Sequence, residues 1–161
     1  MKRKVIVMGV SGCGKSLIGN LLAKHLSVSF FDGDDYHPPS NLDKMGAGIP
    51  LNDVDRTGWL ITLNQLINSE TSLVLACSSL KSEYREILRE GNSVLFIYLK
   101  GDKETIWQRH QQREGHYFKG RYMLDSQFAE LAEPTTCESI HIDINQSVEK
   151  VLADILDKMA A

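Results

Sequence analysis

Residues 9–16 read Gly-Val-Ser-Gly-Cys-Gly-Lys-Ser and match the phosphate-binding pattern G-x-x-x-x-G-K-[ST] at every position. Glycines let the backbone bend around phosphate oxygens, so that successive N–H groups point toward them. Lys15 is expected to reach the β- and γ-phosphates of a nucleotide, and the Ser16 hydroxyl to ligate Mg²⁺. The pattern predicts a nucleotide-binding loop made of Gly9, Val10, Ser11, Gly12, Cys13, Gly14, Lys15 and Ser16.

An acidic turn, Asp32-Gly33-Asp34-Asp35, follows the second apolar segment of the chain. Phosphoryl transfer needs one carboxylate near Mg²⁺ and another that takes the proton of the attacking hydroxyl. The alternative is a solvated turn that caps a helix. No aspartate follows the apolar stretch at 72–77, where many nucleotide-binding proteins carry a metal-binding carboxylate. The metal role therefore shifts to Asp32 or Asp34.

Further polar side chains follow this turn. His37 and Lys44 lie in a segment dense in hydrogen-bonding groups and are candidates for substrate contact. Asp53 and Asp55 open a predicted helix, and we expect simple N-capping to explain at least Asp53. Arg56 is a candidate for gripping an anionic or polyhydroxy substrate.

A polar group also follows the third apolar strand. Ser78, a candidate for substrate contact, comes directly after it, and Lys81 and Arg85 follow, four residues apart. That spacing places the two basic side chains on one helix face, where they could bind substrate or form an ordinary basic surface.

Arg109 and Arg113 have the same spacing near the end of a helix that leads into residues 114–121. Gly115 and Gly120 bracket this polar segment and could act as hinges. A lid arginine would neutralise charge on the transferred phosphoryl group, and both arginines are candidates for nucleotide contact. The alternative is that they compensate the helix dipole.

These residues need a scaffold, and strands alternate with helices along the chain. This alternation predicts an α/β fold with a parallel five-stranded sheet covered by helices on both faces, whose ligands bind at the carboxyl ends of the strands. Residues 33–54 and 114–121 are predicted to be long polar loops. We expect strands at 4–8, 28–31, 72–77, 94–99 and 139–143, and helices at 15–26, 55–68, 81–90, 102–112, 122–131 and 147–159.

The composition fits one globular domain over residues 1–161, with 42% hydrophobic and 24% charged residues. The net charge of −3 and the lack of a basic run give no support for a nucleic-acid partner. No apolar run reaches membrane-spanning length, and three widely separated cysteines indicate no disulfide framework. We therefore expect a cytoplasmic protein.

The chain resembles the gluconate kinases, or gluconokinases, over essentially its whole length. The most specific matches are the D-G-D-D-x-H-P-P block at 32–39 and the C-S-S-L-K-x-x-Y-R block at 77–85, continued by residues 126–128, Ser-Gln-Phe. The resemblance implies a P-loop fold like that of nucleoside monophosphate kinases, with a small lid at about 114–121. It also implies ATP-dependent phosphorylation of D-gluconate on its 6-hydroxyl, and often a homodimer. By resemblance to shikimate kinases, Asp32 would bind Mg²⁺ through water and Asp34 would act as the base.

Other functions remain as alternatives. A kinase for another small hydroxy acid, such as shikimate, would share the P-loop and the two aspartates. A regulatory nucleotide-binding module is the alternative outside enzymes, and residues 55–58 match the D-x-x-G pattern of GTPases. However, these residues do not follow an apolar strand, and no N-K-x-D guanine signature occurs in the chain. The intact Lys15, Ser16, Asp32 and Asp34 also argue against a non-catalytic module.

Overall fold

A computed structural model describes residues 3–111 and 121–161. Its centre is a five-stranded sheet in the order β2-β3-β1-β4-β5, and every neighbouring pair is parallel. The predicted α/β architecture is confirmed, and each strand begins and ends within one residue of its predicted bounds. The strands are β1 (Lys4–Met8), β2 (Ser29–Asp32), β3 (Leu73–Ala76), β4 (Leu95–Lys100) and β5 (Ser139–Asp143).

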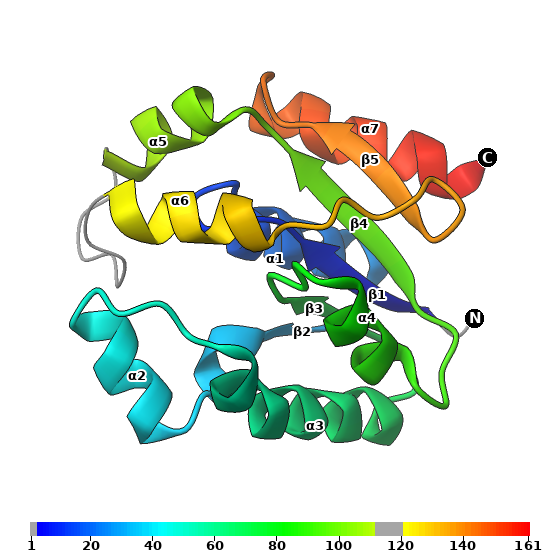
Figure 1. Ribbon diagram of the computed structural model, residues 1–161. Helices are drawn as coiled ribbons and strands as arrows, with labels where there is room; N and C mark the ends of the chain where they lie inside the picture. Colours follow the sequence, from blue (N-terminus) through cyan, green and yellow to red (C-terminus); the bar gives the residue numbers. More distant parts are fainter. Residues whose placement is uncertain (1–2, 112–120) are drawn as a thin grey trace.

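Helices cover both faces of the sheet (Figure 1). α1 (Lys15–Leu26) and α7 (Val148–Ala160) pack on one face, and α3 (Asp53–Ser69) and α4 (Ser82–Arg89) on the other. α5 (Lys103–Gln111) and α6 (Arg121–Glu130) lie beside the carboxyl ends of the strands. Within the described ranges 3–111 and 121–161, no helix is long and apolar enough to cross a bilayer.

The prediction of an irregular loop over residues 33–54 was wrong. The segment contains a 3₁₀ turn, η1 (Gly33–Tyr36), and an eight-residue helix, α2 (Pro39–Gly46). Pro39 occupies the first helical turn, where its fixed φ favours the helix and its missing N–H is not needed. The helix buries Met45 and the polar Asn41, so its apolar stripe is too short to stand out in the sequence.

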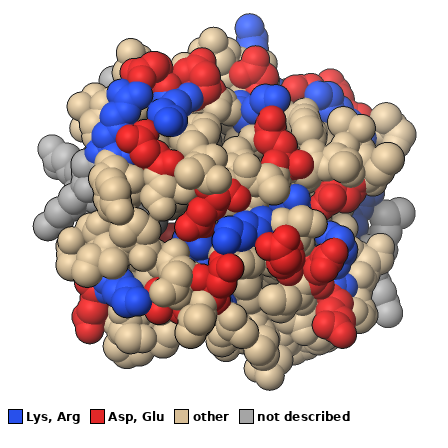
Figure 2. All heavy atoms as spheres, viewed as in Figure 1, with Lys and Arg blue, Asp and Glu red and all other residues tan. Residues whose placement is uncertain are grey.

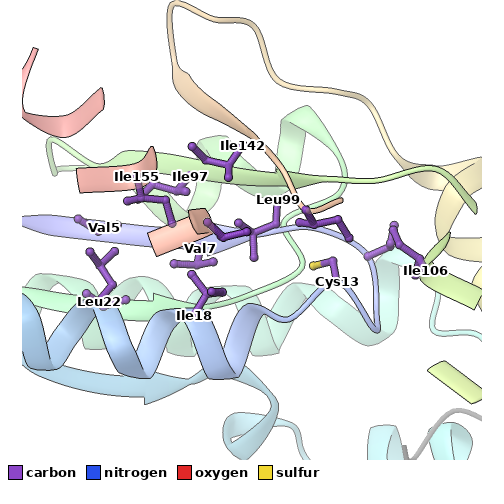
Figure 3. Packing of buried hydrophobic residues seen from close by; sticks show 14 of the residues in the cluster. Val5, Val7, Cys13, Ile18, Leu22, Ile97, Leu99, Ile106, Ile142 and Ile155 are labelled. Carbon is purple, nitrogen blue, oxygen red and sulfur yellow. The ribbon is translucent and has the colours of Figure 1, made fainter. Parts of the chain in front are cut away.

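Residues of β1 alternate between two hydrophobic cores. Val5 and Val7 pack with α1 and α7, whereas Ile6 and Met8 pack with α3 and α4. Figure 3 shows the first core around Val5, Val7 and Leu22. Burying one such side chain contributes about 1.5–3 kcal/mol. Because both faces of the strand are buried, its position is held from two sides, and the loop that follows it at Gly9 is held as well.

Surface charges add less to the fold. Acidic and basic side chains are interspersed on the face shown in Figure 2. Lys103 and Arg121 both pair with Asp125, and Lys100 pairs with Glu133, but all these side chains are substantially exposed. Such pairs contribute about 0–1 kcal/mol each. The two apolar cores therefore position the polar edge of the sheet.

Candidate active site

The loop between β1 and α1 has the backbone that a phosphate cradle requires. Gly9 has φ +148°, and a Cβ there would lie 2.7 Å from Cys13 Sγ. Gly14 caps α1 with a left-handed conformation, φ 99°, and supplies no side-chain acceptor to the first helical N–H groups. These N–H groups and the positive end of the helix dipole can therefore bind an anion.

The first two side chains of α1, Lys15 and Ser16, lie where the phosphates of a nucleotide would bind. Lys15 lines a cavity at this edge of the sheet, and its Nζ donates to Val10 O at 3.2 Å. Ser16 Oγ donates to Asp32 Oδ2 at 2.7 Å, which brings the hydroxyl and the carboxylate from β2 together. The other oxygen, Asp32 Oδ1, accepts the Asp34 N–H at 3.0 Å. Asp32 is therefore held in place by both neighbours.

This pair fits Mg²⁺ in the way that the ion usually binds beside nucleotides. Mg²⁺ commonly takes one or two protein ligands and completes its shell with water and phosphate oxygens. Among residues 3–111 and 121–161, no group of three or more His, Cys, Asp or Glu side chains could hold a metal by itself. A metal at Ser16 and Asp32 would accordingly depend on the nucleotide.

A buried histidine lies beside Asp34. His37 stacks on Trp59 with ring centroids 4.1 Å apart, and its Nε2 lies 3.6 Å from Asp34 Oδ1. Asn41 Nδ2 lies 3.1 Å from His37 Nδ1 and also donates to Asp55 O. Because Nδ1 then accepts a hydrogen bond, the ring proton of a neutral His37 belongs on Nε2, facing Asp34.

One cavity gathers residues that lie far apart in the sequence. Its wall includes the phosphate loop, η1, α2, the segment before α3, α3 itself, the loop after β3, and α6. Trp59 donates from Nε1 to Gly33 O at 2.7 Å, and Gly9 N donates to Ser78 O at 3.2 Å, so these walls are tied together. The polar residues that line it include Ser11, Lys15, Asp34, His37, Arg56 and Ser78.

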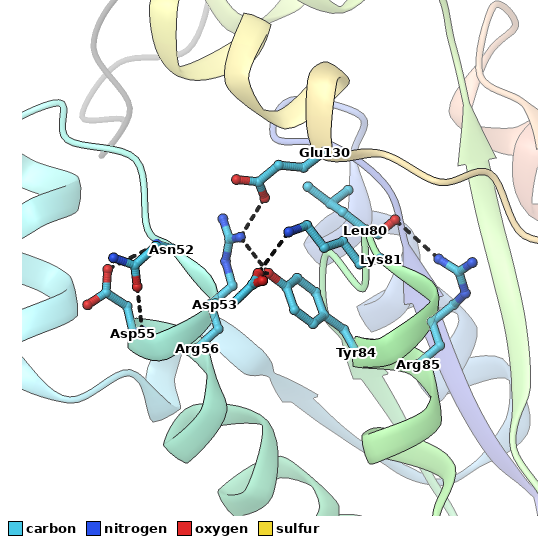
Figure 4. A network of polar contacts seen from close by, with 9 residues as sticks. All are labelled: Asn52, Asp53, Asp55, Arg56, Leu80, Lys81, Tyr84, Arg85 and Glu130. Carbon is cyan, nitrogen blue, oxygen red and sulfur yellow. Dashed lines mark hydrogen bonds and ion pairs between the residues drawn. The ribbon is translucent and has the colours of Figure 1, made fainter.

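Arg56 supplies a fixed positive charge to this cavity. The residue is 8% exposed, and its Nη1 donates to Tyr84 OH at 3.0 Å and to Glu130 Oε2 at 2.5 Å. Figure 4 shows the guanidinium held between α4 and α6. Only Nη1 is used in these contacts, which leaves donors of the planar guanidinium for an anionic ligand.

Asp53 does not cap its helix, contrary to the sequence-based expectation. Asn52 is the N-cap of α3 and exchanges hydrogen bonds with Asp55 in a capping box. Asp53 instead accepts from Lys81 Nζ at 2.8 Å and from the Tyr84 hydroxyl. Both hydrogen bonds lower the pKa of Asp53, and the one from Lys81 has the larger effect. Asp53 therefore tethers the loop before α4 to α3.

The basic residues Lys44, Lys81 and Arg85 lie apart from the cavity wall. Lys44 Nζ is 2.9 Å from both carboxylate oxygens of Asp55. Lys81 is the extended N-cap of α4, so it does not share a helix face with Arg85 as its spacing predicted. Arg85 is 2% exposed and donates to Ser79 O, where it supports the loop after β3.

Arg109 lines a second cavity behind the phosphate loop. Its Nη2 donates to Ile144 O at 2.6 Å, and the same cavity is lined by Gly14, Leu17 and Val148. Arg113 and most of the predicted lid fall among residues 112–120, outside the described part of the chain, and the lid stays a prediction.

Two contacts from α6 were missed by the sequence analysis. Gln127 Oε1 accepts the Ser11 N–H at 2.6 Å, and Glu130 holds Arg56. The Ser-Gln-Phe block indicated that this helix matters. However, no sequence pattern predicts which distant residue a single Gln or Glu will contact. Their partners lie 116 and 74 residues away in the sequence.

The sheet order, the loop of residues 9–16 and the two aspartates after β2 define a P-loop kinase for small molecules. A family profile described as shikimate kinase matches residues 11–160.

Individual relatives narrow this class. The thermosensitive gluconokinase of Escherichia coli K12 is 49% identical over 154 residues, which cover 91% of this chain and 81% of that protein. The thermoresistant gluconokinase of the same organism is 45% identical over 160 residues, covering 94% and 90%. The crystal structure of a gluconokinase from Sinorhizobium meliloti 1021 superposes with a TM-score of 0.91 at 35% identity, covering 99% of this chain and 92% of that one. The chain thus belongs to the gluconokinases within the shikimate kinase family.

Proposed function

We propose that this chain transfers the γ-phosphoryl group of ATP to the 6-hydroxyl of D-gluconate, with Mg²⁺, and releases 6-phosphogluconate and ADP. The observation that carries this proposal is that Lys15, Asp34 and Arg56 line one and the same cavity. These residues provide a cation for phosphate, a base for a hydroxyl and a cation for a carboxylate, which are the three needs of this reaction.

The nucleotide would occupy the loop of residues 9–16 with its phosphates against the N-terminus of α1. Lys15 would balance the charge that develops on the γ-phosphoryl group. When bound, Mg²⁺ would neutralise phosphate charge, held by the Ser16 hydroxyl directly and by Asp32 through water. The adenine ring of ATP would enter the second cavity, where Leu17 and Val148 offer apolar surface and Arg109 offers a planar cation.

Asp34 would accept the proton of the attacking hydroxyl. Its side chain is 52% exposed and lines the cavity, and His37 Nε2 lies 3.6 Å from its Oδ1. Asp32 accepts a hydrogen bond from Ser16 Oγ at 2.7 Å and so lies at the proposed metal position. In this arrangement Asp32 would serve the metal and Asp34 would serve the substrate hydroxyl.

Gluconate is an anion at one end and is phosphorylated at the other. Arg56 is the cation placed to bind its carboxylate, while Asp34 and Lys15 act at the opposite end of the same molecule. Binding both ends orients the 6-hydroxyl for in-line attack.

Shikimate is the second candidate substrate, because the matching family profile carries the description shikimate kinase. The relatives at 45–49% identity are named gluconokinases, which favours gluconate. A cytoplasmic location and a homodimer stay predictions.

A coupled assay that detects both ADP and 6-phosphogluconate tests the proposal. We expect turnover that requires gluconate and Mg²⁺ together, and that stops when EDTA removes the metal. Shikimate and related sugar acids serve as comparison substrates under identical conditions. Turnover of shikimate without turnover of gluconate would overturn the substrate assignment.

A further inference from the structure

Gln127 joins α6 to the phosphate loop through one end of its carboxamide. The residue is 8% exposed, and its side chain reaches the Ser11 N–H at 2.6 Å. A backbone N–H can only donate, so the atom that faces it must be the carbonyl oxygen Oε1. This contact determines which way the carboxamide points, and Nε2 occupies the other position.

The Nε2 end has a different environment. Among residues 3–111 and 121–161, Gln127 makes no side-chain hydrogen bond other than the one to Ser11. Gln127 also lines the cavity that contains Lys15 and Asp34. Two N–H donors therefore remain for whatever occupies this cavity, close to the atoms that would transfer the phosphoryl group.

The rest of α6 holds Gln127 in this position. Glu130 lies one helical turn further along and is bonded to Arg56, while Met123 is buried and lines the same cavity. Residues three and four positions apart share one face of a helix. The inward face of α6 thus extends from the phosphate loop at Gln127 to the carboxylate-binding end at Arg56.

We propose that Gln127 is a substrate-binding residue of this kinase. Oε1 holds the phosphate loop through Ser11, and Nε2 donates a hydrogen bond to a hydroxyl oxygen of gluconate near the end that is phosphorylated. This inference rests on the proposed function. A site that hydrogen-bonds a substrate hydroxyl discriminates strongly against compounds that lack it, so Gln127 favours polyhydroxy acids.

Two substitutions separate the two ends of the carboxamide. Gln127→Glu keeps an oxygen acceptor for the Ser11 N–H but replaces the donor with a carboxylate oxygen that faces an anionic substrate. Gln127→Met has a similar volume and removes both ends. Gln65→Glu makes the same charge change on the exposed side of α3 and is the matched control.

Steady-state kinetics with ATP and gluconate, together with thermal melting, provide the readouts. For Gln127→Glu we expect kcat/KM for gluconate to fall by about 10- to 100-fold, while the KM for ATP and the melting temperature stay near those of the wild type. For Gln127→Met we expect a lower melting temperature and a higher KM for both substrates. Gln65→Glu should match the wild type in every measurement.

The outcomes separate this inference from the proposed function. If the wild type phosphorylates gluconate and Gln127→Glu does so with unchanged kcat/KM, the Nε2 contact is wrong and the proposed function stands. A Gln127→Met variant that melts and turns over like the wild type contradicts both contacts of the carboxamide. If the wild type does not phosphorylate gluconate, the proposed function fails, and this inference fails with it.

Discussion

The two ends of the cavity are built in different ways. The phosphate end comes from eight consecutive residues and relies on backbone N–H groups and glycine conformations. At the other end, Arg56 lines the cavity. It belongs to a network of side chains from α3, α6, α4 and the N-cap of α4, which also contains Asp53, Lys81, Tyr84 and Glu130 (Figure 4). The phosphate end is therefore encoded locally, and the network exists only after distant segments have met.

This difference has a physical consequence for substitutions. Changing a loop residue that contributes only its N–H leaves the phosphate contact in place, provided that the backbone conformation survives. Each member of the network is instead a partner whose loss leaves another polar group unpaired, which costs about 1–3 kcal/mol when the site is buried. We expect substitutions of Lys15 and Ser16, whose side chains act on the phosphates and Mg²⁺, to affect turnover, and substitutions in the network to affect both stability and substrate affinity.

The largest effect is expected for Asp34→Asn. Asparagine keeps the shape of the side chain but cannot take the hydroxyl proton, so kcat should fall by about 10²–10⁴-fold. ATP affinity should persist, because residues 9–16 are unchanged. Asp32→Asn is the companion variant and should weaken the Mg²⁺ dependence instead. Metal titrations of both variants would reveal whether the two carboxylate roles have been exchanged.

Lys15→Ala should lower kcat by about 10²–10³-fold, since it removes a charge that stabilises the transition state. Among residues 3–111 and 121–161, the one hydrogen bond of its Nζ is the 3.2 Å contact to Val10 O, so the fold has little need of it. Melting curves of the apoprotein should therefore overlay those of the wild type. A Lys15→Ala protein that is unfolded, or one with near-normal turnover, contradicts this role.

Tyr84→Phe tests the network without changing its charge. The substitution removes the hydroxyl that accepts from Arg56 and donates to Asp53. We expect a loss of about 1–2 kcal/mol of stability. Arg56 would keep its contact with Glu130 and its place over the ring at position 84, but would lose one hydrogen bond. We expect the KM for gluconate to rise by about 3- to 10-fold, in line with that loss.

The KM for ATP should not change in Tyr84→Phe. Tyr122→Phe is the control, because the Tyr122 side chain is 69% exposed and belongs to neither end of the cavity. Equal gluconate KM values for the two variants would show that Tyr84 does not position Arg56.

The smallest effect concerns Asp53 and pH. Hydrogen bonds from Lys81 and Tyr84 lower the pKa of Asp53 below its ordinary value of 3.8. Its contribution to stability is therefore complete above that value, and is lost as the pH falls through the lowered pKa of the folded state. Asp53→Asn should reduce the melting temperature slightly at neutral pH, and this difference from the wild type should shrink below about pH 4. Asp157→Asn, an exposed carboxylate on α7, is the control for charge removal.

Much of the scaffold could be predicted because its signals are local. Strands such as β3 and β4 are continuous apolar runs, and burial on both faces favours such runs in parallel sheets. α2 was missed because it has eight residues, of which two, Leu42 and Met45, carry large apolar side chains. Lys81 and Arg85 were placed on one helix face because spacing does not reveal that α4 begins after Lys81.

The sequence by itself determined the phosphate loop, its neighbouring aspartates and the strands of a parallel sheet, because these depend on glycine conformations, apolar runs and the alternation of strands with helices. Only the tertiary structure decided that Asp53 binds Lys81 and Tyr84 rather than capping α3, that Arg85 is buried away from the cavity, and that Gln127 and Glu130 reach the phosphate loop and Arg56. The physical reason is that one polar side chain can satisfy its hydrogen bonds with many partners. Packing of the helices against the sheet selects among those partners.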